Sequence, residues 1–112
     1  MEAVVQLLGD PTRRRILELI WLEERSVGDI TRQLPVTYGA VSQHLRLLLD
    51  AGAVQVRREG KFRFYRADIE ALGPVGDMLH TMWSSRLKRL KTLAELEEHR
   101  PRATRSRKRS KS

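Results

Sequence analysis

The sequence has no cysteine, and this absence excludes several kinds of site at once. The 112-residue chain can form no disulfide, no thiolate metal site and no cysteine nucleophile. It also has no stretch approaching the roughly 20 apolar residues that a membrane-spanning helix needs, and its first residues lack the basic region of a signal peptide. We therefore expect a soluble, cytoplasmic protein with no membrane partner.

Catalytic groupings are also missing. We find no Ser/His/Asp set, phosphate-binding loop or pair of carboxylates at a useful spacing. The three histidines, His44, His80 and His99, are too far apart in the sequence to form a typical set of metal ligands. The sequence therefore predicts neither an enzyme nor a protein that holds a metal or another cofactor.

Acidic residues are absent from the C-terminal end, and this decides where the net charge of +8 lies. Residues 100–112 carry seven Lys and Arg, which leaves 15 basic and 14 acidic residues in positions 1–99. We expect one domain over residues 1–99 and a basic, disordered tail over 100–112 that adds nonspecific affinity for DNA. Within the domain, the stretch 54–66 has five basic residues against the single acid Glu59. This local excess favours a polyanionic partner more than the net charge does.

Helix signals occupy the first half of the chain. A short helix over about residues 2–8 should end at Gly9, and Asp10 followed by Pro11 is a strong start for the next helix. A third helix should begin at Ser26, which has an acid three residues later, and run through Leu34.

Thr37 should cap a fourth helix, separated from the third by only Pro35 and Val36, with Gly52 just after its end. Alternation over residues 54–66 around Glu59-Gly60 then predicts a β-hairpin. From Asp68 the pattern is helical again to about Glu98, with an interruption near Gly73-Pro74. The order predicts a mainly α fold with a small β-hairpin, a winged helix-turn-helix.

Polar side chains lie opposite the apolar stripe of the fourth helix. Gln and Arg make two-point hydrogen bonds to adenine and guanine, and small residues allow the helix to approach the bases closely. The hairpin adds Arg and Lys side chains, which can bind the phosphates of the DNA backbone. The alternatives are an ordinary solvated helix face and an edge strand protected from aggregation by its charges. The candidate DNA contacts are Thr37, Tyr38, Gly39, Ser42, Gln43 and Arg46 on the helix, and Arg57, Arg58, Lys61 and Arg63 on the hairpin.

The first and last helices carry more apolar residues than one small domain needs. A homodimer interface would bury this excess, and two-fold symmetry would then require an inverted-repeat target. Alternatively, the Met and Trp residues fill the domain's own core or line a ligand pocket. The candidate interface residues are Val4, Leu7, Leu8, Leu79, Met82, Trp83, Leu87 and Leu90.

Four motifs in this order strongly resemble the ArsR/SmtB family of winged-helix repressors. They are LGDPTRRRIL (8–17), SVGDI (26–30), AVSQHLRLL (40–48) followed by AGAV (51–54), and RREGKFRFY (57–65). The resemblance implies a homodimeric repressor, joined through its first and last helices, that leaves DNA when an effector binds. It also assigns Ser42, Gln43, His44 and Arg46 to the recognition helix, and Arg58, Lys61 and Arg63 to the wing.

The resemblance does not extend to the family's metal sites. Metal-sensing members use a cysteine pair in the helix matching residues 26–30, or Asp and His residues in the last helix. This chain has no cysteine, Asp77 and His80 are three positions apart instead of two, and the second His would fall near Lys91. The chain is similar to family members without metal sites. A small-molecule effector is therefore possible, but the sequence does not identify it.

The sequence thus predicts a DNA-binding transcriptional regulator, a homodimeric repressor with double-stranded DNA as its partner. A different hypothesis is a protein interaction module that contacts an acidic partner through its wing, with a nucleic-acid-binding tail.

Overall fold

The computed structural model describes residues 2–98, and the side chains of residues 3–89. The chain divides after Thr81 into two units. The predicted basic tail at residues 100–112 lies outside the described residues and stays a prediction. The described part is mainly helical with one three-stranded antiparallel sheet, which confirms the predicted fold class. Its helices include none long and apolar enough for a bilayer.

Four helices come first: α1 (Glu2–Leu7), α2 (Pro11–Leu19), α3 (Val27–Arg32) and α4 (Tyr38–Asp50). Each predicted N-cap is confirmed. The Asp10 carboxylate accepts from the backbone N–H of Thr12 at 2.7 Å, the Ser26 hydroxyl from Asp29 at 3.1 Å, and the Thr37 hydroxyl from Ala40 at 3.1 Å. The third helix ends at Arg32, two residues before the predicted end at Leu34.

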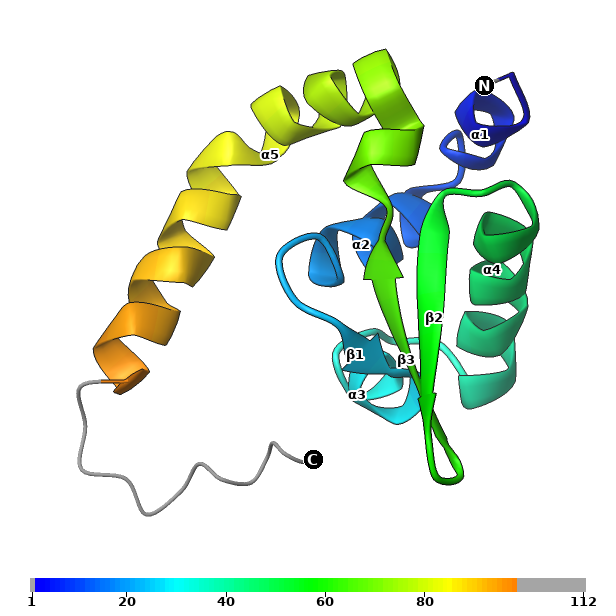
Figure 1. The fold of residues 1–112 in the computed structure, drawn as a ribbon, viewed down its shortest axis with the longest axis horizontal. Coiled ribbons are helices and arrows are strands. Elements are labelled where there is room, and N and C mark those ends of the chain that lie inside the picture. The colour runs from blue at the N-terminus through cyan, green and yellow to red at the C-terminus, as the bar shows by residue number, and fades with distance from the viewer. Residues whose placement is uncertain (1, 99–112) are drawn as a thin grey trace. The chain divides into compact units, whose positions relative to one another are not determined.

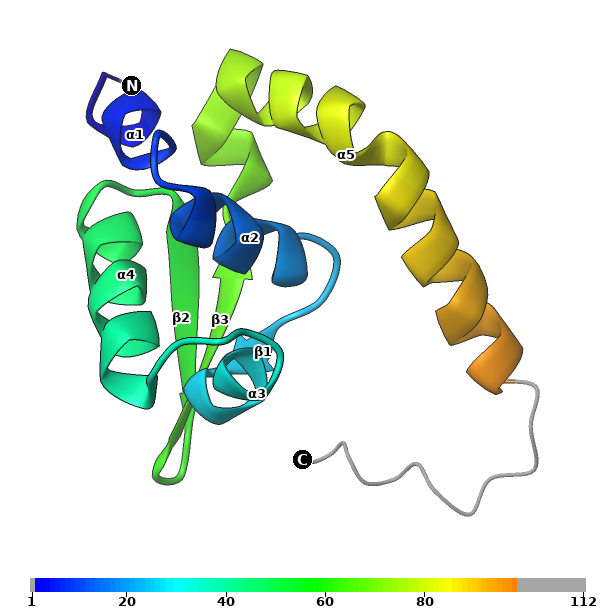
Figure 2. The ribbon, with the colours of Figure 1, turned by 180° about the vertical axis from the view of Figure 1, so that it is seen from behind.

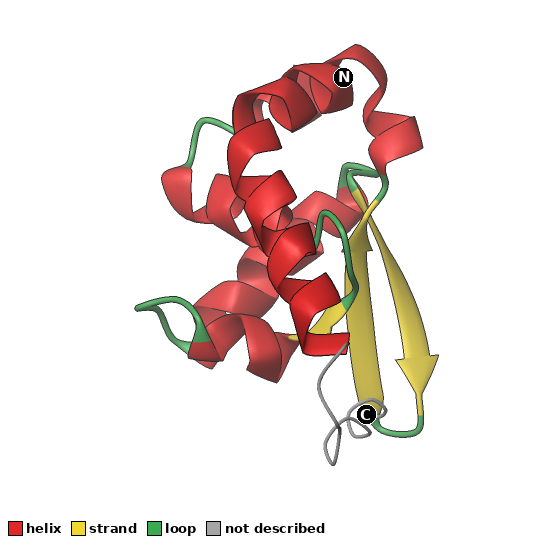
Figure 3. Cartoon of the chain, turned by 90° about the vertical axis from the view of Figure 1, so that its left-hand side faces the viewer, coloured by secondary structure: helices red, strands yellow, loops and turns green. Residues whose placement is uncertain are grey.

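The sheet has the strand order β1-β3-β2, formed by β1 (Arg25–Ser26), β2 (Val54–Glu59) and β3 (Phe62–Ala67). β2 and β3 make the predicted hairpin, called the wing below, with Gly60 and Lys61 as its two-residue turn and Gly60 at φ 62°. Figure 3 shows the two long strands running side by side to this short turn. The sequence did not predict β1, because two residues are too few to show alternation.

The core lies between the helices and one face of the sheet. Figures 1 and 2 show α2 and α3 behind the sheet in one view and in front of it in the other, with α4 beside β2. The wing tip extends beyond the ends of α3 and α4 (Figure 1). The largest fully buried side chains of the first four helices and the turn after α2 are Ile16, Leu17, Ile20, Trp21, Ile30, Val41, Leu45 and Leu48.

Helix α5 (Ile69–Glu98) contains the predicted interruption. Gly73 has φ 55° and ψ −130°, outside helical geometry, and Pro74 follows it. A positive φ costs glycine little, and proline cannot donate to the preceding turn, so the two residues kink the helix here. Before the kink Leu72 is buried, and after it Leu79 is buried. These two side chains hold the start of α5 in the core of the first unit.

Candidate nucleic-acid interface

Helix α4 has one buried face and one exposed face. Val41, Leu45 and Leu48 are fully buried, and their spacing of four and three residues places them on one stripe. Ser42, Gln43 and Arg46 lie on the other side and are exposed, as the sequence predicts. The buried stripe fixes the rotation of the helix, so these hydrogen-bonding side chains are held outward.

The start of α4 is also open to solvent. Tyr38 is 60% exposed, and nothing lies within 4 Å of the position that a Cβ atom would take at Gly39. The Thr37 side chain is engaged as the N-cap, so its hydroxyl already accepts a hydrogen bond from the helix. The free amides and the positive end of the helix dipole favour an anion here.

His44 is half-buried, whereas Ser42, Gln43 and Arg46 of the same helix are exposed. Its ring Nδ1 lies 3.1 Å from Nη1 of Arg13, which can only donate, so this nitrogen accepts the hydrogen bond. The Nε of Arg13 also donates to the carbonyl oxygen of Leu7 at 2.7 Å. One side of the His44 ring therefore joins α4 to α2 and to the end of α1.

The register of the wing sorts its cations onto two faces. Directly paired residues of an antiparallel hairpin share a face, and the faces alternate along each strand. Arg58 pairs with Arg63, and the same face continues through Val56–Tyr65 to the buried pair Val54–Ala67. Arg58 and Arg63 therefore extend the helix-facing side of the wing beyond the core, where both are exposed.

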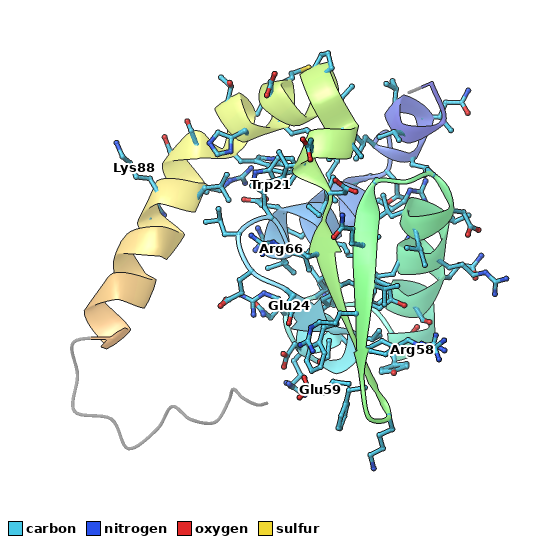
Figure 4. The ribbon with its side chains drawn as sticks, viewed as in Figure 1. Trp21, Glu24, Arg58, Glu59, Arg66 and Lys88 are labelled. Carbon is cyan, nitrogen blue, oxygen red and sulfur yellow. The ribbon has the colours of Figure 1, made fainter. Side chains whose placement is uncertain are left out.

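The opposite face of the wing carries Arg57, which pairs with Phe64. Arg57 is bound to two carboxylates, those of Glu24 and Glu59, and its guanidinium lies 4.8 Å from the centre of the Phe64 ring. In Figure 4, Arg58 lies on the α4 side of the wing, whereas Glu24 and Glu59 lie on the other side. The hydrogen bonds from Arg57 lower the pKa of the Glu24 carboxyl, and Glu24 in turn raises the pKa of Arg57.

Lys61 completes the predicted set at the wing tip. It is exposed, and its ammonium group lies 5.8 Å from the centre of the Phe62 ring. The structure thus exposes Lys61, Arg58 and Arg63. Arg57 is also exposed, but its guanidinium is bound to two carboxylates of the same chain. A polyanion approaching the helix-facing side of the wing would meet the first three.

Comparisons with known proteins agree with this geometry. The family model for the bacterial regulatory protein, arsR family, matches residues 10–56. The HTH-type transcriptional regulator Rv2034 of Mycobacterium tuberculosis is 39% identical over 82 residues, which cover 73% of this chain and 77% of that protein. The chain belongs to the ArsR family of bacterial regulatory proteins.

Other relatives extend the ArsR-family comparison. The transcriptional repressor SdpR of Bacillus subtilis is 32% identical over 72 residues, covering 64% of this chain and 80% of that protein. A solution structure of a homodimeric winged helix-turn-helix DNA-binding domain from Mycobacterium bovis matches with a TM-score of 0.64 at 27% identity, covering 77% and 80%. These relatives are regulators, so this ArsR-family chain is a DNA-binding transcriptional regulator and not an enzyme.

Two partners of the site were missed by sequence reasoning. Glu24 binds a wing arginine 33 positions away, and Arg13 binds a histidine 31 positions away. A single acid or base carries no signal for such a distant partner. The crowding of charge in the hairpin was the available sign that some of its arginines would be paired within the protein.

The predicted dimer residues of this ArsR-family protein differ in exposure. Met82 is exposed, Leu7 is half-buried, and the side chain of Leu90 lies outside the described set. The others are already buried within the chain, namely Val4, Leu8, Leu79, Trp83 and Leu87. Two apolar residues of the same helices that the prediction left out are also exposed: Val5 on α1 at 53% and Met78 on α5 at 55%.

The described side chains contain no cluster of three or more His, Asp or Glu residues that could hold a metal ion. His80 is engaged with the core, because the indole N–H of Trp21 donates to its Nδ1 at 3.1 Å. Asp77 lies on the same helix, three residues earlier.

Proposed function

We propose that the protein is a homodimeric repressor that binds an inverted-repeat operator in double-stranded DNA. One observation carries the proposal. Helix α4 presents Ser42, Gln43 and Arg46 outward, and the wing presents two arginines that are opposite each other on adjacent strands, Arg58 and Arg63, on its helix-facing side. A helix with these side chains fits the major groove, where Gln and Arg discriminate adenine and guanine. As a bacterial DNA-binding regulator, the protein would act in the cytoplasm.

Helix α4 and the wing would make different kinds of contact with DNA. Arg46 and Gln43 would contact base edges and set the preferred sequence. Arg58, Lys61 and Arg63 would contact phosphates, which hold the protein in position and strengthen binding to any duplex. Tyr38 at the open start of α4 would contact the backbone beside the groove.

Repression and dimer formation are supported by the relatives. SdpR is named a repressor, and the Mycobacterium bovis domain is homodimeric. In this chain, we assign the interface to the exposed apolar residues of α1 and α5, with Val5 and Met78 as its members in the first unit. Met82, one helical turn after Met78, belongs to the same face of α5. Burying such residues against a second copy would remove apolar surface from water.

The test is selection of duplexes from a random pool by the purified full chain. The expected product is an inverted repeat whose half-sites lie about 10 base pairs apart or slightly more. Affinity should fall steeply with salt, because phosphate contacts release counterions. Binding without sequence preference, or without salt dependence, would contradict the proposal. A direct repeat, or a monomer in sedimentation at the concentrations used, would contradict its dimeric part.

Repression itself needs a second measurement. A reporter gene placed under the selected operator should be expressed less when the protein is present. An Arg46→Ala variant, produced at the same level, serves as the control that keeps the fold but weakens operator contact. Increased expression with the wild-type chain would identify an activator instead.

A further inference from the structure

Arg57, the wing arginine on the face away from the proposed DNA surface, makes four hydrogen bonds to carboxylate oxygens. The Nε of Arg57 donates to both carboxylate oxygens of Glu24, at 3.1 and 3.2 Å, and its Nη2 donates to Oε1 at 2.5 Å. Its Nη1 donates to Glu59 at 2.8 Å. Its guanidinium carbon also lies 4.8 Å from the centre of the Phe64 ring, so Glu24, Glu59 and Phe64 all interact with this side chain.

The Glu24–Arg57 ion pair connects parts of the sheet that are not hydrogen-bonded to each other. Glu24 immediately precedes β1, and Arg57 lies in β2, so their ion pair joins the two outer strands across the middle strand β3. Arg57 crosses above Phe64, which is the residue of β3 opposite it in the register. The Glu24–Arg57 ion pair therefore ties the wing strand nearest α4 to the segment that follows α2.

The next residue along β2 is Arg58, whose side chain lies on the opposite face. A change in the twist of β2 at Arg57 would move Arg58 and its cross-strand partner Arg63 together. We propose that Glu24 and Arg57 are positioning residues, which hold the wing at the angle that Arg58 and Arg63 need to reach the phosphates, and that Arg57 makes no phosphate contact itself. This inference rests on the proposed function, because it assigns the wing its task on DNA.

Opposite charge changes provide the sharpest test. Glu24→Gln removes a negative charge and Arg57→Gln removes a positive one, so a purely electrostatic effect would shift DNA affinity in opposite directions. If the two residues act as one positioning pair, both variants should weaken operator binding in the same direction, by about two- to fivefold. The double variant should lose no more affinity than the weaker-binding single variant, since each substitution breaks the same ion pair.

The salt dependence distinguishes positioning from phosphate contact. With full-length protein and the selected operator, the slope of log affinity against log salt should stay unchanged in Arg57→Gln. In the matched control Arg58→Gln the slope should become shallower by about 0.9 for each phosphate that the variant no longer neutralises. Hydrogen exchange of the wing amides in the free protein should speed up in Glu24→Gln and Arg57→Gln, and not in Arg58→Gln.

Three results would overturn the inference: a shallower slope in Arg57→Gln, tighter binding in Glu24→Gln, or unchanged operator affinity in both. The first two would instead make Arg57 a phosphate-binding residue that Glu24 competes for. Failure of the proposed function looks different, because then the wild-type chain itself would show no operator preference or no salt dependence.

Discussion

Helix α4 and the wing expose side chains of different chemistry, and different interactions hold the two elements in place. The outward residues of α4 are mostly uncharged, and three fully buried side chains on the opposite stripe set their direction. The wing tip extends beyond the ends of α3 and α4, and the charged residues of the wing are mostly cations. The Glu24–Arg57 ion pair connects the wing to the segment before β1. The part proposed to discriminate bases is thus anchored by apolar burial, which salt does not weaken. The part proposed to hold phosphates depends partly on electrostatics, which salt screens.

The largest effect expected from this comparison is on stability. Leu45→Ala should lower the free energy of unfolding by about 2–5 kcal/mol, because it removes a fully buried side chain and leaves a cavity under α4. Urea denaturation measures this decrease. Gln43→Ala, on the exposed face of the same helix, should stay within about 0.5 kcal/mol of wild type. Similar decreases for the two variants would refute the two-faced description of α4.

The next effect concerns sequence preference. Arg46→Ala should cost about 1–3 kcal/mol of discrimination at one position of each half-site, because alanine cannot make the two hydrogen bonds that arginine offers to guanine. Lys61→Ala should weaken binding to operator and random duplexes alike. Titrations of both variants against operator and against single-base changes measure the difference. If Lys61→Ala altered the preferred sequence, the division between helix and wing would be wrong.

The helices were predictable because their signals are local. Asp10, Ser26 and Thr37 cap helices within three residues of themselves, and the apolar spacing of α4 follows from its own sequence. The kink in α5 was predictable for the same reason, since Gly73 and Pro74 are adjacent. The exposed residues of α4 followed directly from its period.

The pairing within the site could not be predicted, because it joins residues that are distant in the sequence. Strand alternation alone places Arg57 and Arg58 on opposite faces of the wing. The sequence gives no sign that Glu24 lies beside Arg57, because only the fold brings these two residues together. His44 likewise falls near the predicted outward face, while its bond to Arg13 depends on how α2 packs against α4. Strand β1 forms only because β3 is there to pair with it.

A smaller effect should follow from the cap of α4. Thr37→Ala should lower the free energy of unfolding by about 1 kcal/mol, since the N–H of Ala40 would have no side-chain acceptor. Thermal or urea unfolding measures this change, and Thr37→Ser, which keeps the hydroxyl, is the control. If Thr37→Ala instead left stability unchanged and weakened DNA binding, the hydroxyl would belong to the DNA surface and not to the cap.

The smallest expected effect is on the pH dependence of stability. It distinguishes the wing, which an ion pair stabilises, from α4, which apolar burial stabilises. The folded protein lowers the pKa of Glu24 from its ordinary value of 4.5, mainly through the hydrogen bonds from Arg57. The ion pair therefore adds stability above the unfolded pKa, and this addition disappears as the pH falls through the lower, folded pKa. Unfolding of wild type and Glu24→Gln, compared from about pH 7 to about pH 3, should show a difference that shrinks at the acid end. The difference between wild type and Leu45→Ala should not follow this course, because no proton is bound or released at Leu45. A Glu24 difference that persisted at low pH would mean that the side chain stabilises the wing by packing alone.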